Sequence, residues 1–426
     1  MANRPVGIDL FAGAGGLSLG FEQAGFEIAA AVELDPIHAA IHKFNFPTCT
    51  TICRSVVGLT GDQIREHAAL RDREVDVVFG GAPCQGFSMI GKRALDDPRN
   101  QLVAHFARIV VELKAKYFVF ENVKGLTLGR HRQFLGELID FFRGSDYQVL
   151  QAYEVLNAAH YGVPQDRRRL FLMGARRGLP LPKYPERRGS VSVAQALGDL
   201  PNADDYPELL QRDSIAAQFG QPSKYASYLR GLELDPEDYS YNRQWDSQLL
   251  TSSLRTEHTE KSRQRFRETE HGKTEPISRF HKLNPDGVCN TLRAGTASDH
   301  GAFTSPRPIH PHLPRVITVR EAARLHSYPD WFRFHVTKWH GFRQIGNSVP
   351  PLLARSIAGE IRAALGAPAI KPRETLPLGD ESLLRFDMSE AARYFGVPRD
   401  TIAQRRRIAE PAAEYLVAAQ GPTIAA

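Results

Sequence analysis

The sequence predicts an α/β fold built on a mostly parallel sheet. Strand-like and helix-like segments alternate through residues 5–180, a pattern that places helices on both faces of such a sheet. The strand-like runs also end in loops rich in glycine and polar residues. Composition agrees, since 42% hydrophobic and 24% charged residues are ordinary for a globular protein. Ligands are then expected at the carboxyl ends of the strands.

The alternating segments follow one another in a regular order. "VGIDLF" predicts a buried strand and "GGLSLGFEQAG" a helix, and "EIAAAVEL" and "DPIHAAIHKF" repeat the pair. Asp35 is expected to cap this second helix, with Pro36 in its first turn. "VDVVFGG" predicts a third strand, followed by helix "NQLVAHFARIVVELK", strand "KYFVFENV", helix "HRQFLGELIDFFRGSDY" and, near the far edge, strand "RRRLFLMGAR".

The 426 residues are enough for two or three domains. Residues 1–180 and 335–368 are expected to form a catalytic, cofactor-binding domain, to which the helix predicted in "FRQIGNSVPPLLARSIAGEIRAAL" returns. Residues 181–334 have many prolines and charges and little periodicity, which predicts a second, smaller and irregular domain. A Pro/Gly-bearing linker, "GAPAIKPRETLPLGDES", then leads to the tail.

The tail, residues 380–412, has the pattern of a helix-turn-helix module. A turn at Gly396 separates two helix-like segments. Four arginines would lie on or near the second helix: Arg399, Arg405, Arg406 and Arg407. The tail is therefore either an additional DNA-binding module or a small helical cap with a basic surface.

Several function classes are disfavoured by composition. No segment approaches the about 18 apolar residues of a membrane helix, and no signal peptide is expected. The 4 cysteines are scattered, which indicates a reducing, cytoplasmic setting. Cys49 and Cys53, with His38 and His42 upstream, fit no common zinc spacing, so no metal is expected. The net charge of +6 is compatible with a nucleic-acid partner.

A glycine-rich turn, "DLFAGAGGLSLGF", follows the first strand. The glycines let the backbone approach a ligand closely beside a helix N-terminus. The dinucleotide pattern G-x-G-x-x-G fails because Ser18 replaces its third glycine, which weighs against a nicotinamide enzyme. An adenosyl ligand without phosphates fits this wider turn. Glu33, at the end of the second strand, is placed to bind ribose hydroxyls.

Chemically reactive side chains lie at the ends of three further strands. "GGAPCQGFS" carries Cys84, "FENV" carries Glu121 and Asn122, and "QDRRR" carries Arg167 and Arg169, which alternate and so face one side. Taken singly, each could be a structural residue, because ion pairs also form such clusters. Together, a thiol, a carboxyl group and two guanidiniums suit a polar, electron-poor ring.

These segments, in this order, resemble the DNA cytosine-5 methyltransferases. The similar blocks are "DLFAGAGGLSLGF", "GGAPCQGFS", "RNQL", "FENV", "QDRRR", "VITVREAARLHSYP" and "QIGNSVPP", and they span residues 7–180 and 316–360. The resemblance implies a Rossmann-like S-adenosylmethionine-dependent methyltransferase domain with a smaller target-recognition domain. The short α-helical C-terminal module lies beyond the similar blocks.

The resemblance also implies roles for individual residues. Cys84 would attack C6 of cytosine, Glu121 would hold N3 and the exocyclic amine, and Arg167 and Arg169 would contact O2 and the active-site loop, Arg167 more directly. Residues implied at the cofactor are Phe11, Gly13, Gly15, Gly16, Leu17, Glu33, Leu34, Ser55, Val56, Pro83, Asn347 and Ser348. Residues implied at DNA are Gln85, Ser88, Lys92, Arg93, Thr291, Leu292 and Arg293.

One position departs from the family pattern. After the relevant strand, members usually have an Asp-Ile or Asp-Val pair at the adenine amine, where this chain has Ser55-Val56. Either Ser55 does this work more weakly or Asp62 takes the position.

The predicted activity is methyl transfer from S-adenosylmethionine to C5 of a flipped-out cytosine in a specific double-stranded DNA sequence, through a covalent Cys84 adduct. A restriction-modification or orphan setting is expected, with a cognate restriction endonuclease as a candidate partner. We expect a cytoplasmic monomer without membrane contact. Two alternatives remain at this point: a tRNA cytosine-5 methyltransferase and a non-catalytic DNA-binding regulator.

Overall fold

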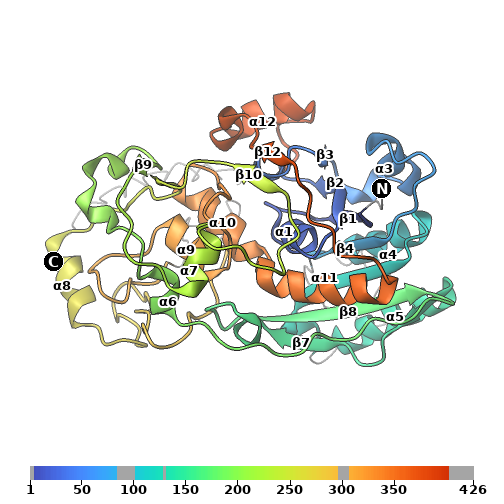
Figure 1. The fold of residues 1–426 in the computed structure, drawn as a ribbon, viewed down its shortest axis with the longest axis horizontal. Helices are drawn as coiled ribbons and strands as arrows, with labels where there is room; N and C mark the ends of the chain where they lie inside the picture. The colour runs from blue at the N-terminus through green and yellow to red at the C-terminus, as the bar shows by residue number, and fades with distance from the viewer. Residues whose placement is uncertain (1–3, 84–100, 128–130, 296–306, 403–426) are drawn as a thin grey trace, which may run out of the picture.

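The computed structural model describes residues 4–83, 101–127, 131–295 and 307–402. An eight-stranded sheet forms its centre (Figure 1). Its strands are β1 (Val6–Leu10), β2 (Glu27–Glu33), β3 (Thr50–Cys53), β4 (Val77–Gly80), β5 (Tyr117–Val123), β6 (Tyr147–Val149), β7 (Glu154–Asn157) and β8 (Arg168–Arg176).

The strand order is β3-β2-β1-β4-β5-β8-β6, and β7 also pairs with β8. The first five of these strands are parallel neighbours, whereas β8 runs antiparallel to β5, β6 and β7. The predicted fold class is confirmed. The sequence reading omitted β3, β6 and β7, so "VDVVFGG" forms the fourth strand rather than the third. All three are short and none carries a long apolar run.

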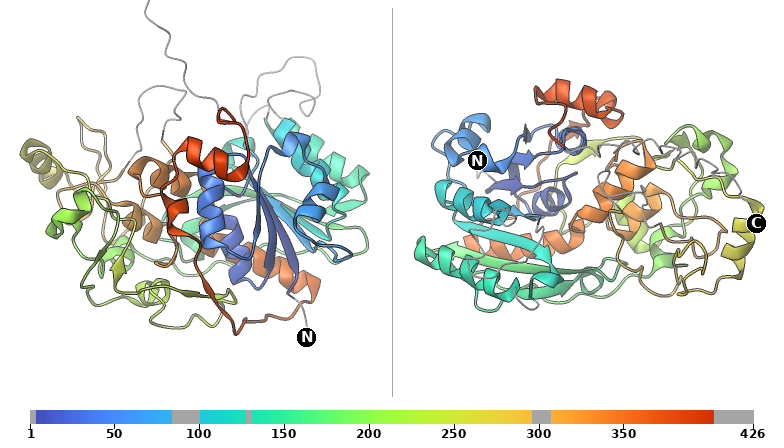
Figure 2. Two further views of the ribbon diagram at one scale, coloured as in Figure 1. Left: turned by 90° about the horizontal axis from the view of Figure 1, so that it is seen from above. Right: turned by 180° about the vertical axis from the view of Figure 1, so that it is seen from behind.

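Helices cover both faces of the sheet (Figure 2). Helices α1 and α11 share one apolar core with the sheet, and α3, α4 and α5 share the other. The helices of this domain are α1 (Gly16–Gln23), α2 (Pro36–Asn45), α3 (Gly61–His67), α4 (Gln101–Glu112), α5 (His131–Gly144), α10 (Lys338–Asn347) and α11 (Pro351–Leu365). Throughout the described part of the chain, no helix has the length and apolar character needed to cross a membrane.

Two features predicted near helix ends can be checked directly. Asp35 caps α2 by accepting hydrogen bonds from the backbone N–H groups of Ile37 and His38, as expected. The single helix expected near residues 342–365 is instead two helices, α10 and α11. Pro350 and Pro351 explain the break, because the residue before a proline is disfavoured in helical conformation. Helix α11 packs closely on α1, as expected for a helix returning to the first domain.

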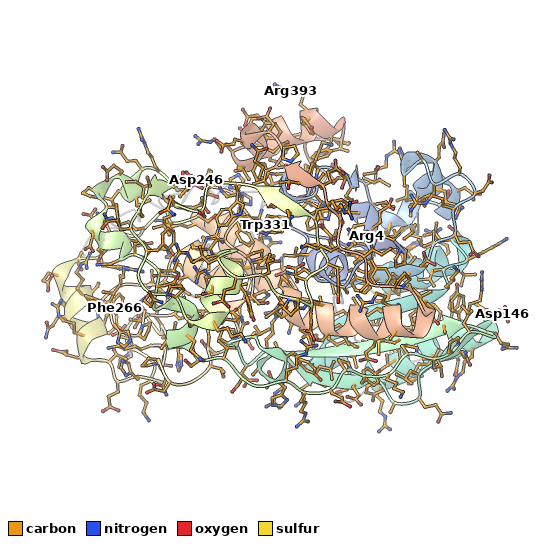
Figure 3. All side chains as sticks on the ribbon, viewed as in Figure 1. Arg4, Asp146, Asp246, Phe266, Trp331 and Arg393 are labelled. Carbon is orange, nitrogen blue, oxygen red and sulfur yellow. The ribbon has the colours of Figure 1, made fainter. Side chains whose placement is uncertain are left out.

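The recognition region, defined here as residues 181–334, consists of short elements joined by long loops. These are α6 (Val193–Leu197), α7 (Lys224–Leu229), α8 (Glu260–Glu268), α9 (Val319–Leu325), β9 (Ile215–Ala216), β10 (Asn242–Gln244) and β11 (Leu249–Leu250). Phe266 lies in a small cluster at its far end (Figure 3). Tyr328, Phe332 and Phe334 instead join the core under α1 and α11. The domain boundaries therefore remain a prediction.

The segment before the tail pairs with the recognition region, and the tail itself packs against the sheet domain. Strand β12 (Thr375–Pro377) pairs in parallel with β10, and the short helix η8 (Glu381–Leu384) and α12 (Met388–Phe395) lie on α2. Helix α12 and the turn at Gly396 match the first half of the predicted helix-turn-helix. Arg405, Arg406 and Arg407 lie outside the described residues, so this prediction is open.

Candidate active site

The loop predicted to carry the nucleophile leaves the sheet beside Glu121. A Cβ atom at Gly81 would lie 2.4 Å from Glu121 Oε2, so no larger residue fits there without a shift. The Asn122 side-chain amide donates a hydrogen bond to the Ala82 carbonyl oxygen at 3.0 Å. The ends of β4 and β5 therefore hold the start of this loop against the carboxylate.

Five predicted site residues lie outside the described residues: Cys84, Gln85, Ser88, Lys92 and Arg93. The structure follows the loop as far as Pro83, which is exposed. The roles given to these five residues remain predictions.

Glu121 and Arg169 form an ion pair at the end of β5. Arg169 Nε lies 2.9 Å from Glu121 Oε1, and the two side chains are 13% and 11% exposed. Burial raises the pKa of Glu121, although the positive charges of Arg169 and Arg167 oppose the rise. The carboxyl group therefore takes up a proton more readily than an exposed glutamate, while Arg169 fixes its orientation.

The Arg167 guanidinium is engaged away from the Glu121–Arg169 ion pair, and the expectation that Arg167 contacts the base more directly than Arg169 stays a prediction. Its side chain is fully buried. The guanidinium donates to three carbonyl oxygens: Leu292 at 2.9 Å, Gly346 at 2.7 Å and Ser348 at 2.7 Å. Arg167 thus joins the recognition region to the loop between α10 and α11, and Arg169 is the arginine at the carboxylate.

A buried polar network continues from this point. The Gln165 amide donates to His326 Nδ1 at 2.9 Å, and its oxygen accepts from the Leu292 backbone N–H at 3.1 Å. Ser348 Oγ donates to the Ile345 carbonyl oxygen, so His326 Nε2 is the donor to Ser348 Oγ, at 3.1 Å. Burial holds the pKa of His326 well below its usual range, which keeps the ring neutral. The sequence reading missed His326, although it lies within "REAARLHSYP".

The predicted DNA-binding segment at residues 291–293 is largely committed to internal contacts. The Thr291 hydroxyl donates to the Asp166 carbonyl oxygen at 2.6 Å. Leu292 is only 2% exposed, and its expected place at DNA stays a prediction. Arg293 is exposed and remains available to a ligand.

The glycine-rich turn is held by Glu33. Glu33 Oε2 accepts from the Gly13 backbone N–H at 2.7 Å, and Oε1 accepts from that of Asp35 at 2.8 Å. Gly13 has a φ of 56°, and an added Cβ there would meet no described atom within 4 Å. The turn thus faces open space with a carboxylate beside it. Each oxygen of Glu33 retains a lone pair for a further hydroxyl donor.

The turn also meets the loop between α10 and α11. A Cβ atom at Gly16 would lie 2.4 Å from the Val349 carbonyl oxygen and 2.9 Å from Ser348 Cβ. The structure therefore brings together two predicted cofactor segments that are more than 300 residues apart in sequence. Exposure differs among the other candidates: Asn347 and Leu34 are exposed, Phe11 is half-buried, and Gly15 and Leu17 are buried.

Ser55 lies just after β3, at the position where family members usually have the aspartate of the Asp-Ile or Asp-Val pair. Cys53 of β3 pairs in register with Glu33 of β2, so Ser55, two residues later, lies at the same edge of the sheet. Its hydroxyl accepts from the Val57 backbone N–H at 3.2 Å, and Val56 is buried. Asp62 is exposed in the first turn of α3. Of the two alternatives, the structure favours Ser55.

Ser18 has a structural role beneath the turn. Its hydroxyl donates to Asp9 Oδ2 at 2.6 Å and lies 3.0 Å from His42 Nε2. Burial raises the pKa of Asp9 to about 8 and lowers that of His42 to about 3. The sequence reading used Ser18 only as a departure from the dinucleotide pattern. Within the described ranges, no three His, Cys, Asp or Glu side chains are grouped so as to hold a metal.

Comparison with known proteins identifies the class. The sequence profile of the family described as C-5 cytosine-specific DNA methylase matches residues 6–363. The chain belongs to this family, and the predicted DNA (cytosine-5)-methyltransferase activity is thereby confirmed.

Individual relatives agree with this assignment. The chain is 66% identical over 404 residues to the type II methyltransferase M.XorII of Xanthomonas oryzae pv. oryzae, covering 95% of both chains. It is 31% identical to M.AgeI of Thalassovita gelatinovora, covering 84% of this chain and 99% of the relative. A solved structure described as a putative prophage-encoded DNA modification methyltransferase (E. coli) is 34% identical, with a TM-score of 0.70, covering 85% of this chain and 99% of that one.

Proposed function

We propose that this methyltransferase uses S-adenosylmethionine to methylate one cytosine within a specific double-stranded DNA sequence, with Cys84 as the nucleophile and Glu121 and Arg169 at the base. The observation that carries the proposal is the ion pair of Glu121 with Arg169, located where the Cys84 loop leaves the sheet. An oriented carboxyl group of raised pKa at the start of this loop supports the proposal.

The residues at the glycine-rich turn fit an adenosyl cofactor. The turn faces open space at Gly13, and Glu33 offers acceptor oxygens for ribose hydroxyls. Asn347 is exposed at the adjoining loop, where an amide can bind a carboxylate or an ammonium group. When bound there, S-adenosylmethionine would supply the methyl group.

The protein residues would then carry the remaining steps. The Cys84 thiolate would add to C6 of the flipped base, which shifts electron density to C5 for capture of the methyl group. Glu121, held by Arg169, would bind N3 and the exocyclic amine and share a proton with N3 as charge builds there. Loss of the C5 proton to a base and breaking of the sulfur–C6 bond would restore the aromatic ring and the free thiolate.

Transfer of tritiated methyl groups to DNA or to tRNA tests the substrate class, and bisulfite sequencing of the product then locates the methylated cytosine. Labelled 5-methylcytosine in DNA is the expected result. Label in tRNA but not in DNA, with an active preparation, would refute the DNA proposal.

Cys84→Ala tests the nucleophile. Methyl transfer should fall by at least about 1,000-fold because no covalent adduct can form, while DNA binding changes little. Cys49→Ala is the matched control, since Cys49 is a buried thiol in the core whose pKa is raised well above its usual value. Retained turnover in Cys84→Ala, or equal loss in both variants, would contradict the role of Cys84.

The relatives named type II methyltransferases motivate a proposal about biological setting. We propose that the protein protects DNA from a restriction endonuclease of the same specificity. Plasmid DNA recovered from cells that express the protein should resist an endonuclease that cuts at the mapped site. Full cleavage of methylated plasmid would argue against protection.

A further inference from the structure

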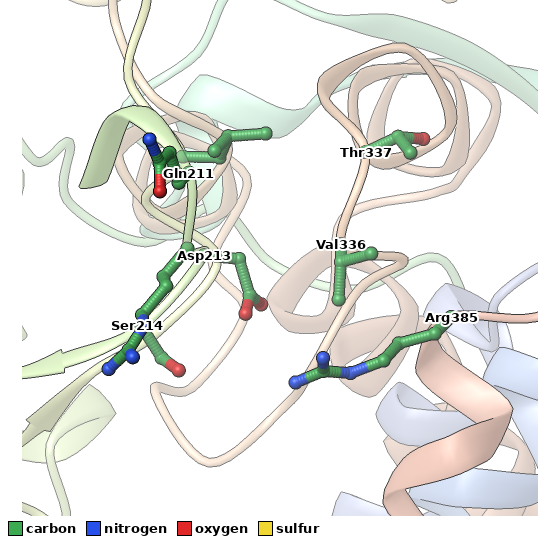
Figure 4. A pocket seen from close by; sticks show the side chains of 8 residues that line it. Gln211, Asp213, Ser214, Val336, Thr337 and Arg385 are labelled. Atoms are coloured by element: carbon green, nitrogen blue, oxygen red, sulfur yellow. The ribbon is translucent and has the colours of Figure 1, made fainter. Parts of the chain in front are cut away.

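A cleft of about 600 Å³ separates the recognition region from the tail (Figure 4). It is distinct from the candidate active site, since neither Glu121 nor the glycine-rich turn lines it. One wall is formed by the segment at residues 211–214 with Leu254, and the other by Val336, Thr337 and Arg385. Arg385 lies beyond residue 363, where the match to the family ends.

Two arginines on opposite walls give this cleft its charge. Arg212 belongs to the recognition region and Arg385 to the tail, and both are exposed. Among the described residues, neither guanidinium has a hydrogen-bond or ion-pair partner. Most arginines of the recognition region are engaged with carboxylates or carbonyl oxygens, so two unpaired guanidiniums facing one cleft are unusual here.

The tail holds Arg385 in a defined place. The Leu384 carbonyl oxygen accepts from the Val336 backbone N–H at 3.0 Å, and the Phe386 carbonyl oxygen lies 3.2 Å from His335 Nε2. The residues before and after Arg385 are therefore both tied to the wall of the cleft. Leu384 is also buried in the cluster that joins the tail to α2. The backbone position of Arg385 thus follows from these contacts.

The nearby acidic groups are already engaged. Asp213, on the cleft wall, pairs with Arg333 at 3.4 Å. Asp380 and Asp387 accept hydrogen bonds from backbone N–H groups at the starts of η8 and α12. Glu381 lies 3.7 Å from Arg333. The two free positive charges are therefore available to an external anion.

We propose that this cleft binds the phosphate backbone of the DNA duplex outside the methylated site, with Arg212 and Arg385 as the contacts. Exposed guanidiniums recognise phosphate oxygens through charge-assisted, bidentate hydrogen bonds. The proposal rests on DNA being the substrate and adds a contact that the tail contributes. It gives the tail a role in DNA affinity that does not depend on a second helix after Gly396.

The test uses the full-length protein and a fluorescent duplex of about 30 base pairs, titrated over a range of salt concentrations. In the double variant Arg212→Gln/Arg385→Gln, the slope of log K against log salt should become shallower by about 2, because each phosphate contact contributes about 0.9. The dissociation constant at low salt should rise about tenfold. Arg212→Lys/Arg385→Lys keeps the charge and should keep the slope.

Arg71→Gln is the control, since Arg71 is exposed between α3 and β4 and does not line the cleft. It should leave affinity and slope unchanged. An unchanged slope in the double Gln variant, or an equal change in the control, would overturn the proposal. Methyl transfer by the wild-type protein is measured in parallel, so that a failure of the cleft is distinguished from a failure of the DNA methylation proposal.

Discussion

The sheet and the recognition region bury side chains of different kinds. In β4 and β5 the interior is apolar: Val77, Val78, Phe79 and Phe118 are fully buried. In the recognition region Arg324 is just as buried, but it pairs with Asp330 at 2.6 Å and with Asp199 at 3.0 Å. In β4 and β5, burial removes apolar side chains from water. In the recognition region, it also removes paired charged side chains from water.

This difference follows from backbone regularity. Neighbouring strands of the sheet satisfy one another's N–H and C=O groups, so their side chains can all be apolar. The short elements of the recognition region leave carbonyl groups that need donors, and Arg320 donates to three of them: those of Thr251, Pro329 and Phe332. Apolar burial stabilises without directional preference, whereas buried ion pairs require one geometry. The irregular structure of the recognition region can thus still be rigid.

The largest expected effect comes from breaking the central ion pairs. Arg324→Met should lower the free energy of unfolding by about 3–5 kcal/mol, because Asp330 and Asp199 are left buried without their shared partner. Urea unfolding of the variant and wild type measures the difference. The triple variant Arg324→Met/Asp330→Asn/Asp199→Asn should recover part of the loss, since the two carboxylates are no longer buried as charges. The recovery is incomplete because Arg230 and Arg320, which also pair with Asp199 and Asp330, lose those partners.

Leu172→Ala provides the comparison in the sheet. Leu172 is fully buried, and its truncation should cost about 2–5 kcal/mol through lost contacts and a cavity. No second substitution that removes charge should rescue it. If neutralising the carboxylates failed to rescue Arg324→Met, the contrast between the two regions would not hold.

A somewhat smaller effect is expected from pH. Burial favours the protonated form of Glu321, but Arg315 outweighs it and lowers the pKa of Glu321 from 4.5 to about 2. Because the folded pKa is depressed, this pair stabilises the fold above about pH 4.5, and about 3 kcal/mol should be lost as pH falls toward 2. Glu321→Gln should flatten this part of the stability curve.

Asp9 in β1 should change stability with pH in the opposite direction. Burial raises its pKa from 3.8 to about 8, so the fold should lose stability as pH rises through this range. Asp9→Asn should remove that slope. Urea titrations of both variants from acid to mildly alkaline pH check the two signs, and an identical pH dependence in the two variants would contradict the comparison.

The smallest effect concerns the junction between the regions. His326→Leu should raise KM for S-adenosylmethionine about tenfold with less change in kcat, because Ser348 and Gln165 lose their shared partner. His326→Gln keeps a donor and an acceptor and should stay within about threefold of wild type. Equal losses in the two variants, or a loss confined to kcat, would show that His326 does not position the cofactor loop.

Much of the sheet domain was predictable from local sequence. Apolar runs alternating with helical spacing predicted the central strands, and the Asp35-Pro36 pair predicted the start of α2. The two consecutive prolines, Pro350 and Pro351, are the sequence signal for the break between α10 and α11. Strand β3 was not predicted because "TTIC" is short and only half of it is buried.

Some residues of the candidate site could likewise be placed from the sequence, and others could not. Glu121 and Arg169 could be placed because both lie on neighbouring strands of a regular sheet. The burial of Arg167 and Leu292 could not be predicted, since it depends on carbonyl groups and packing supplied by segments more than 120 residues away. Alternation along one strand indicates which way a side chain points, but not what covers it.

Arg167 has a consequence for how recognition specificity can be exchanged between relatives. Its guanidinium donates to one carbonyl group from the recognition region, one from the last turn of α10 and one from the loop after α10. A chimera that imports a foreign recognition region must therefore reproduce the backbone path at residue 292 as well as the DNA-reading side chains. Crossover points should therefore lie outside this junction. The chimera then takes Arg167 and the carbonyl groups that it binds from the same parent protein.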